Sequence, residues 1–374
     1  MQTLLEITAF SGIAFSFFLI LLLVLKSEKG RADFILMGWF VGIMVHCIYF
    51  YLTVMGKAES NQLIQSIGSA LPVLHIPVFY LYTKELVEKN SYQSWVIGFS
   101  PFIIYLLFFY VAISNQLLFY DRFELFISGG APFWVGLISP LMIFIVIVFI
   151  WFIRKLIQKQ MFLVRQHFSY ETKSTLEWVN YWLVTLGIGA LVIVITILLA
   201  DSGLYSYSVS YSITFLLIDV QLLFVGIYGL KQTTFFLNKL PIVDVDEPKL
   251  KYEKSSLKDE DSEIIIQKLY TAMKDDRLYL NPELTITNLA DQIGHSKVLI
   301  SQTLNQKLGV NFFDFVNKYR VEEVKLLLDN SENDHLSILG IAMEAGFSSK
   351  STFNKCFKKF TGYTPSNYKK NLGK

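Results

Sequence analysis

The first 230 residues consist of long apolar runs separated by short polar segments. Each run is long enough to cross a lipid bilayer as a helix, for which about 20 residues are needed. A helix also satisfies its own backbone hydrogen bonds, which a hydrocarbon environment requires. The pattern therefore predicts a seven-span transmembrane bundle over residues 1–230. The spans are expected near residues 4–25, 34–55, 62–83, 93–113, 132–153, 178–200 and 207–230.

The pattern changes twice beyond residue 230. Residues 231–261 contain Pro241, Pro248 and mixed charges with little apolar periodicity, which is typical of a linker. In residues 262–374, apolar side chains recur at the spacing of short amphipathic helices. We therefore predict an all-α chain: a polytopic seven-helix transmembrane bundle, a charged linker, and a soluble domain.

The composition supports the membrane prediction and indicates little other chemistry. Apolar residues make up 53% of the chain and charged residues 17%, which is more apolar than an ordinary soluble protein. The first run lacks a basic leader and carries Glu6, so we expect a retained anchor rather than a cleaved signal peptide. Cys47 and Cys356 lie in segments of opposite character, which indicates neither a disulfide framework nor a metal site. No cofactor is indicated.

Positive charge in the loops predicts how the bundle is oriented. The six loops cover residues 26–32, 56–61, 84–92, 114–131, 154–177 and 201–206. The first, third and fifth loops carry ten Lys and Arg residues, whereas the other three carry two. The positive-inside rule then predicts a multi-pass protein of the cell (inner) membrane, with its N-terminus outside and its linker and C-terminus in the cytoplasm. We expect a membrane-surface helix in loop 114–131, and an extension of the fifth helix toward anionic headgroups in loop 154–177.

Residues 337–368 have the pattern of two short helices joined by a tight turn. Ser337 is a good N-cap for the first helix, and Gly346 can adopt the left-handed backbone that ends it. Ser348 or Ser349 caps a second helix, whose outer face is rich in Lys, Ser and Asn. The apolar face of that helix carries Phe353, Cys356, Phe357 and Phe360. This combination is typical of a helix-turn-helix unit that enters the DNA major groove.

Residues 285–309 repeat the same organisation. Thr285 caps a first helix, Gly294 forms the turn, and Ser296 caps a second helix. A long helix near residues 311–329 is expected to join the two units. The C-terminal domain is therefore predicted to contain two helix-turn-helix units.

The later unit resembles the AraC family of transcription regulators, whose signature is AxxAGFSSxSxFxxxFKKxxGxTPxxY. The matching residues are Ala342, Ala345, Gly346, Phe347, Ser348, Ser349, Ser351, Phe353, Phe357, Lys358, Lys359, Gly362, Thr364, Pro365 and Tyr368. The earlier unit is similar to its AraC counterpart through Ala290, Gly294, Ser296, Leu304 and Gly309, and the joining helix has the family's Tyr319-Arg320 pair. The resemblance covers residues 281–370 and does not extend to residues 1–230.

The resemblance implies that the second helix of each unit enters a major groove, with the two grooves about 34 Å apart. The family's base-contacting positions fall at Val298, Ser301, Gln302, Lys350, Ser351, Asn354 and Lys355. Contacts to phosphate, which position a protein without reading sequence, are expected from Lys297, Lys307, Lys358 and Lys359. Asn and Gln can bond adenine through two atoms, and Lys can reach guanine acceptors. The chain departs from the family where a basic residue is common, at Gln302 and Asn305, and where Arg is common, at Lys355.

Three polar side chains are predicted to lie well inside the spans. Asp219 and His46 come at roughly the same depth at about 1.5 Å per residue, with His75 about one turn nearer the cytoplasm. A carboxylate in hydrocarbon is costly unless it is paired or hydrated, so Asp219 is expected to face the bundle interior. One interpretation is a buried Asp–His hydrogen bond that fixes helix packing. The other is a ligand or proton site beside a third helix that Pro72 and Pro77 loosen.

These patterns predict a membrane-embedded transcription regulator with a transmembrane sensor domain. Its expected partners are double-stranded DNA, the lipid bilayer, a second copy of the chain, and a small ligand or proton. The alternative is a transporter or membrane enzyme that an attached helix-turn-helix domain regulates. An enzyme is not expected, because the sequence has no HExxH motif, Gly-rich phosphate loop, Cys/His cluster or nucleophile elbow. The linker leaves open whether the DNA-binding domain acts while tethered or after proteolytic release.

Overall fold

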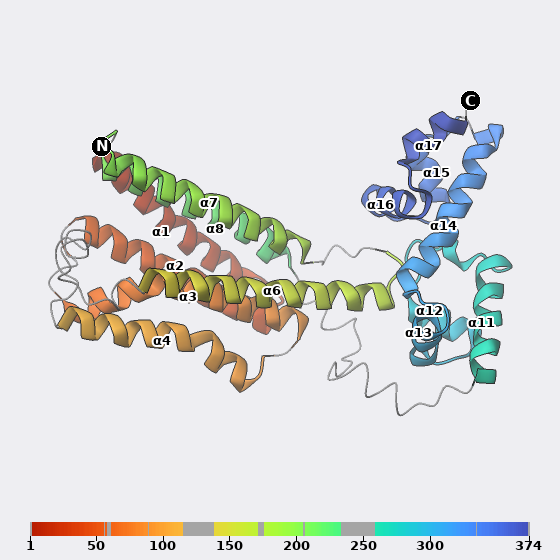
Figure 1. The fold of residues 1–374 in the computed structure, drawn as a ribbon, viewed down its shortest axis with the longest axis horizontal. Helices are drawn as coiled ribbons and strands as arrows, with labels where there is room; N and C mark the ends of the chain where they lie inside the picture. The colour runs from red at the N-terminus through yellow and green to blue at the C-terminus, as the bar shows by residue number, and fades with distance from the viewer. Residues whose placement is uncertain are drawn as a thin grey trace. The chain divides into compact units, whose positions relative to one another are not determined.

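The computed structural model describes residues 2–55, 57, 61–88, 90–114, 138–170, 176–204, 206–232, 259–333 and 335–372. Within these residues every regular element is a helix, which confirms the all-α prediction (Figure 1). The chain divides into two compact units, and each consists of two stretches of sequence. The first unit contains Met1–Gln158 and Leu176–Pro241, and the second contains Lys159–Thr175 and Ile242–Lys374.

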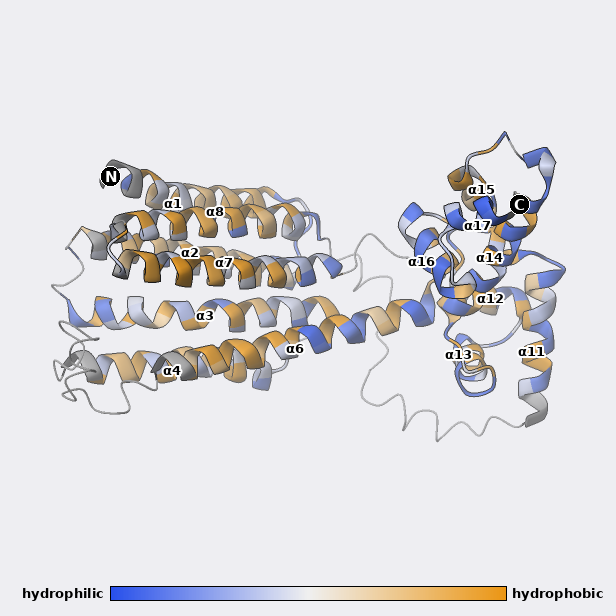
Figure 2. Cartoon of the chain, turned by 45° about the horizontal axis from the view of Figure 1, so that its top comes forward, coloured by the Kyte–Doolittle hydropathy of each residue, from blue (hydrophilic) through white to orange (hydrophobic). Residues whose placement is uncertain are grey.

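Seven helices of the described residues are long and apolar enough to cross a membrane, as the sequence predicts. They are α1 (Gln2–Leu25), α2 (Arg31–Val54), α3 (Gln62–Val87), α4 (Tyr92–Ser114), α6 (Ile138–His167), α7 (Glu177–Asp201) and α8 (Tyr207–Lys231). Figure 2 shows that their residues are predominantly hydrophobic, in contrast to the mixed character of the C-terminal helices. Residues 132–137 of the fifth predicted span and residues 115–131 of the predicted surface helix lie outside the described residues.

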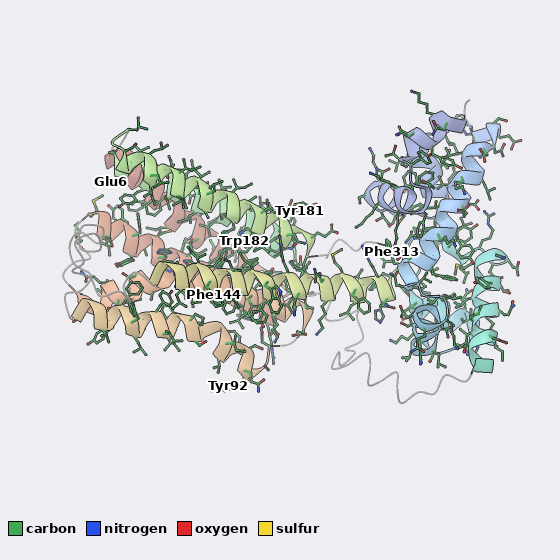
Figure 3. The ribbon with its side chains drawn as sticks, in the orientation of Figure 1. Glu6, Tyr92, Phe144, Tyr181, Trp182 and Phe313 are labelled. Atoms are coloured by element: carbon green, nitrogen blue, oxygen red, sulfur yellow. The ribbon has the colours of Figure 1, made fainter. Side chains whose placement is uncertain are left out.

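The first unit buries aromatic side chains and exposes aliphatic and aromatic ones. Its interior contains Trp39, Phe79 and Trp182, with the ring centroids of Phe79 and Trp182 3.9 Å apart. On the outside, Phe17 and Phe144 are each about six-tenths exposed (Phe144 is labelled in Figure 3). Exposing so much apolar area to water costs free energy, whereas exposing it to lipid, an apolar solvent, does not. The outer surface is therefore suited to apolar surroundings.

The second unit is built on a central helix that joins two small cores. It contains α11 (Asp259–Lys274), η3 (Leu278–Leu280), α12 (Ile286–Ile293), α13 (Lys297–Gln306), α14 (Phe312–Asp329), η4 (Ser331–Asn333), α15 (Ile338–Glu344), α16 (Lys350–Thr361) and α17 (Pro365–Leu372). The N-terminal part of α14 packs with α11, α12 and α13, and its C-terminal part packs with α15 and α16 (Figure 1). One rigid helix therefore carries both helix-turn-helix units.

The predicted caps and turns are present in both units. Thr285, Ser296 and Ser337 each accept a hydrogen bond from a backbone N–H in the first turn of the helix that follows. Of the two candidates for the cap of α16, the structure uses Ser349. The four caps satisfy N–H groups that a helix cannot pair internally, which fixes where α12, α13, α15 and α16 begin.

The turn glycines of the two units differ in their surroundings. Gly294 has a φ of 70° and Gly346 a φ of 91°, both in the left-handed region that only glycine adopts without strain. A Cβ atom on Gly294 would meet open space. A Cβ atom on Gly346 would lie 2.3 Å from the carbonyl oxygen of Tyr279. Gly346 thus allows the second helix-turn-helix unit to pack directly on the backbone of η3.

The end of α6 belongs to the second unit. The helix continues to His167, as the sequence predicts for the fifth helix. Residues 159–170 then pack with the helix-turn-helix domain rather than forming a separate loop. The sequence predicts three contiguous domains with the linker at 231–261, whereas residues 159–170 group with the second unit here. Residues 233–258 of the predicted linker lie outside the described residues.

Candidate nucleic-acid interface

Helix α16 presents a continuous polar face. Its side chains Phe353, Cys356 and Phe357 are buried against α14 and α15, which turns the opposite side of the helix outward. The outward side carries four exposed residues that the sequence predicts to contact bases: Lys350, Ser351, Asn354 and Lys355. Amide, hydroxyl and ammonium groups on one exposed helical face can bond base edges in a major groove.

Two lysines that the sequence predicts to contact phosphate lie at the end of α16. Lys358 is exposed. Lys359 is half-exposed, and its Nζ lies 2.7 Å from a carboxylate oxygen of Asp314 at the start of α14. Lys359 therefore also ties α16 to the central helix. In the other unit, Lys307 is exposed and Lys297 is partly buried.

Helix α13 presents a smaller exposed face than α16. Val298 is half-exposed and Ser301 is partly buried. Gln302 is only 2% exposed, and its amide nitrogen donates to Oε1 of Gln306 at 3.4 Å. In this structure Gln302 is therefore buried, although the family pattern makes it a base-contacting position.

A residue of α6 contacts the exposed side of α13. The amide oxygen of Gln166 accepts hydrogen bonds from Ser301 Oγ at 3.1 Å and from Asn305 Nδ2 at 2.9 Å. Its amide nitrogen donates to Asn305 Oδ1 at 3.1 Å. Sequence reasoning does not identify Gln166, since the only local signal is the length of the loop that contains it. This contact occupies one predicted base-contacting residue, Ser301.

Arg320 of α14 is buried at the junction of the two helix-turn-helix units. Its five N–H groups donate to the carbonyl oxygens of Tyr279, Asn281 and Ser169, the side-chain oxygen of Asn317 and the hydroxyl of Ser169. All of these acceptors are neutral, and burial lowers the pKa of Arg320 to about 10. The guanidinium therefore remains charged at neutral pH. Loss of any one of its acceptors would leave part of a buried charge without a hydrogen bond and would destabilise the fold.

The three polar residues predicted inside the spans lie in two separate places: His46 pairs with His75, and Asp219 pairs with Ser11. The rings of His46 and His75 are stacked, and Nδ1 of His46 lies 2.8 Å from Nε2 of His75. Asp219 bonds to the hydroxyl of Ser11 rather than to either histidine. Its second carboxylate oxygen is buried and has no hydrogen-bond partner within the described residues. The sequence does not predict the contact between the two histidines. Asp219 bonds to Ser11, where one interpretation of the sequence expects a histidine.

Comparison with known proteins identifies the C-terminal domain. A family described as a helix-turn-helix domain matches residues 289–371. An uncharacterized HTH-type transcriptional regulator of Staphylococcus aureus is 35% identical over 92 residues, which is 25% of this chain and 12% of that protein. The probable transcription factor PqrA of Proteus vulgaris is 32% identical over 95 residues, which is 25% of this chain and 75% of that protein. No solved structure matches the chain.

Proposed function

Because the chain belongs to the helix-turn-helix transcription regulators, through an AraC-type domain at its C-terminus, we propose that it is a membrane-embedded regulator of transcription. It binds specific DNA sequences and controls target genes in response to a signal received by its transmembrane bundle. The observation that carries the proposal is the presence of seven bilayer-length helices and two helix-turn-helix units in one chain.

The proposed DNA contacts divide between the two units. In α16, Lys350, Ser351, Asn354 and Lys355 contact bases, because all four are exposed on one face. In α13, Val298 and Ser301 contact bases, and Gln302 does so only after its side chain leaves the protein interior. Phosphates are bound by Lys297, Lys307, Lys358 and Lys359, which gives affinity that falls as salt concentration rises.

The proposed protein lies in the inner membrane with the DNA-binding domain in the cytoplasm. The ten-to-two distribution of basic residues among its loops supports this orientation. Tethering two copies in one membrane raises their effective concentration, so we expect a homodimer on paired target sites. Proteolytic release through residues 231–261 is the alternative. An immunoblot that detects a short soluble product accumulating with target expression would support release over tethered action.

The proposed sensor site lies among the polar residues of the bundle. Ionisable groups inside a membrane are costly and are usually functional, and this bundle contains His46, His75 and Asp219. The unpaired oxygen of Asp219 supports a role in binding a small ligand or a proton. A purely structural role in packing is the competing interpretation.

An exchange of Asp219 for asparagine tests the sensor role. We expect Asp219→Asn to leave membrane insertion and DNA binding intact while transcription no longer responds to the stimulus. The matched control is Ser212→Ala, which removes another buried polar group of α8. A normal response of the Asp219→Asn protein would assign the residue to packing.

The proposed function is tested by selecting DNA with the full-length protein in lipid nanodiscs. A library of random duplexes should yield one shared motif, with affinity that decreases with salt. Enrichment of unrelated sequences would contradict sequence-specific regulation. Uptake of a labelled metabolite by proteoliposomes, without motif enrichment, would instead indicate the transporter alternative.

A further inference from the structure

The last turn of α6 and the residues after it are an integral part of the DNA-binding unit. We call residues 165–170 the α6 strap. Ser169 is fully buried, and both its N–H and its hydroxyl donate to the carbonyl oxygen of Leu284, at 3.2 and 2.7 Å. Phe168 forms an antiparallel bridge with Thr285, the N-cap of α12. The α6 strap is therefore bonded to the start of the first helix-turn-helix unit.

The central helix also depends on the α6 strap. Ser169 supplies two of the five acceptors of Arg320, and its carbonyl oxygen accepts a further bond from Asn317 Nδ2 at 2.8 Å. The guanidinium of Arg165 lies 5.8 Å from the ring centre of Phe313, which is labelled in Figure 3. A buried guanidinium is costly unless its donors are bonded, so Arg320 favours the docked position of Ser169.

Docking of the α6 strap brings Gln166 against the recognition helix α13. Gln166 is 6% exposed and makes three hydrogen bonds to Ser301 and Asn305. A base or phosphate cannot approach this part of α13 while both side chains are hydrogen-bonded to the Gln166 amide. Helix α16 differs, because Lys350, Ser351 and Asn354 are all exposed.

We propose that the α6 strap is an intramolecular inhibitor of the first helix-turn-helix unit. In the docked state Gln166 blocks α13, and only the second helix-turn-helix unit, with α16, is available to DNA. Helix α6 is continuous from Ile138 to His167, so a change in the bundle can reach Gln166 through one helix and does not require the linker. A stimulus that favours the undocked state exposes Ser301 and Asn305 and allows both units to bind. The inference rests on the proposed DNA-binding function and adds its regulation.

The first test removes the Gln166 amide from the full-length protein in nanodiscs. The probe is the duplex that the full-length Gln166→Ala protein enriches from a random library. Without stimulus, Gln166→Ala should bind that duplex roughly tenfold more tightly than the unchanged protein, a coupling of ordinary size for two linked states. Gln158→Ala, which changes an exposed glutamine two turns earlier in α6, is the control and should bind like the unchanged protein.

The second test locks the α6 strap in place and does not depend on a loss of contacts. The double variant Gln166→Cys, Ser301→Cys is joined by a short thiol cross-linker, while the native Cys47 and Cys356 are buried. The cross-linked protein should protect fewer base pairs of the duplex from nuclease than the same protein before cross-linking. Each single-cysteine variant, treated with the same reagent, controls for modification of one thiol.

The outcomes separate this inference from the proposed function. If no full-length protein enriches a motif, the DNA-binding function itself fails. If a motif is enriched but Gln166→Ala and the unchanged protein bind it equally, inhibition by the α6 strap is wrong and regulation by DNA binding survives. Full protection of the duplex by the cross-linked protein would also overturn the inference, because it would show that the docked α6 strap is compatible with DNA.

Discussion

The two helix-turn-helix units share one plan but differ in what their recognition helices present. Helix α16 exposes Lys350, Ser351, Asn354 and Lys355 on one face. On α13, Gln302 is buried and Ser301 is bonded to Gln166, which leaves Val298 as the exposed member of the predicted set. A shared fold therefore does not expose the two recognition helices equally.

The same difference extends to charge. Helix α16 carries four lysines, whereas the α13 region has Lys297 at the start of the helix and Lys307 just beyond its end. Because contacts to phosphate dominate affinity for DNA, the second helix-turn-helix unit is expected to supply most of the binding free energy. In the proposed mechanism, the first helix-turn-helix unit adds affinity and sequence preference once the α6 strap has left α13. Blocking α13 would therefore change affinity and sequence preference without abolishing DNA binding, which suits α13 to regulation.

The largest expected contrast is between the turn glycines. Gly346→Ala should destabilise the DNA-binding unit by more than about 3 kcal/mol, because it adds a backbone collision to a left-handed conformation. Gly294→Ala should cost about 1 kcal/mol, since only the left-handed strain applies. Pulse proteolysis in urea, with the full-length protein in nanodiscs, measures both free energies. Equal losses would show that the close approach of Gly346 to η3 has no energetic role.

A smaller contrast is expected between the two recognition helices. Asn354→Ala should weaken binding to the selected duplex by about 1–3 kcal/mol and relax the preference at one base pair. Val298→Ala should have a smaller effect, because its exposed side chain offers at most an apolar contact to a thymine methyl group. Titrations against the selected duplex and its single-base variants measure both. Loss of binding that is equal for all duplexes would place Asn354 on the phosphate backbone instead.

The smallest effect is expected for the lysines that end α16. Lys358→Ala should weaken all duplexes alike and reduce the slope of log affinity against log salt by about 1. Lys359→Ala should change that slope less, because its ammonium group is already paired with Asp314. Binding measured over a range of salt concentrations compares the two variants. A larger slope change for Lys359 would mean that DNA displaces Asp314 as its partner.

Features that depend on neighbouring residues in the sequence are predicted well here. Bilayer-length apolar runs predict the seven long helices, and hydroxyl caps with turn glycines predict both helix-turn-helix units. Each of these depends on local chemistry and on a repeating pattern that the sequence displays directly. The exposed face of α16 follows in the same way, because its apolar residues recur at helical spacing.

Features that depend on distant contacts are not predicted. The bonds from Gln166 to α13 join segments more than 130 residues apart, and no periodicity encodes them. The local pattern does not encode the burial of Gln302 either. The depth of Asp219 follows from helical rise, but its direction around the helix axis does not, so its bond to Ser11 is unexpected. The acceptors of Arg320 likewise come from three separate segments of the chain.

The central claim is that one chain binds specific DNA while it is embedded in a membrane. The most direct measurement is genome-wide crosslinking of the intact protein in cells, with DNA recovered separately from the membrane and soluble fractions. We predict that the membrane fraction yields a small set of sites that share one motif, and that the full-length protein is crosslinked to them. Recovery of these sites only with a shortened protein in the soluble fraction, or of no shared motif in either fraction, would contradict the account.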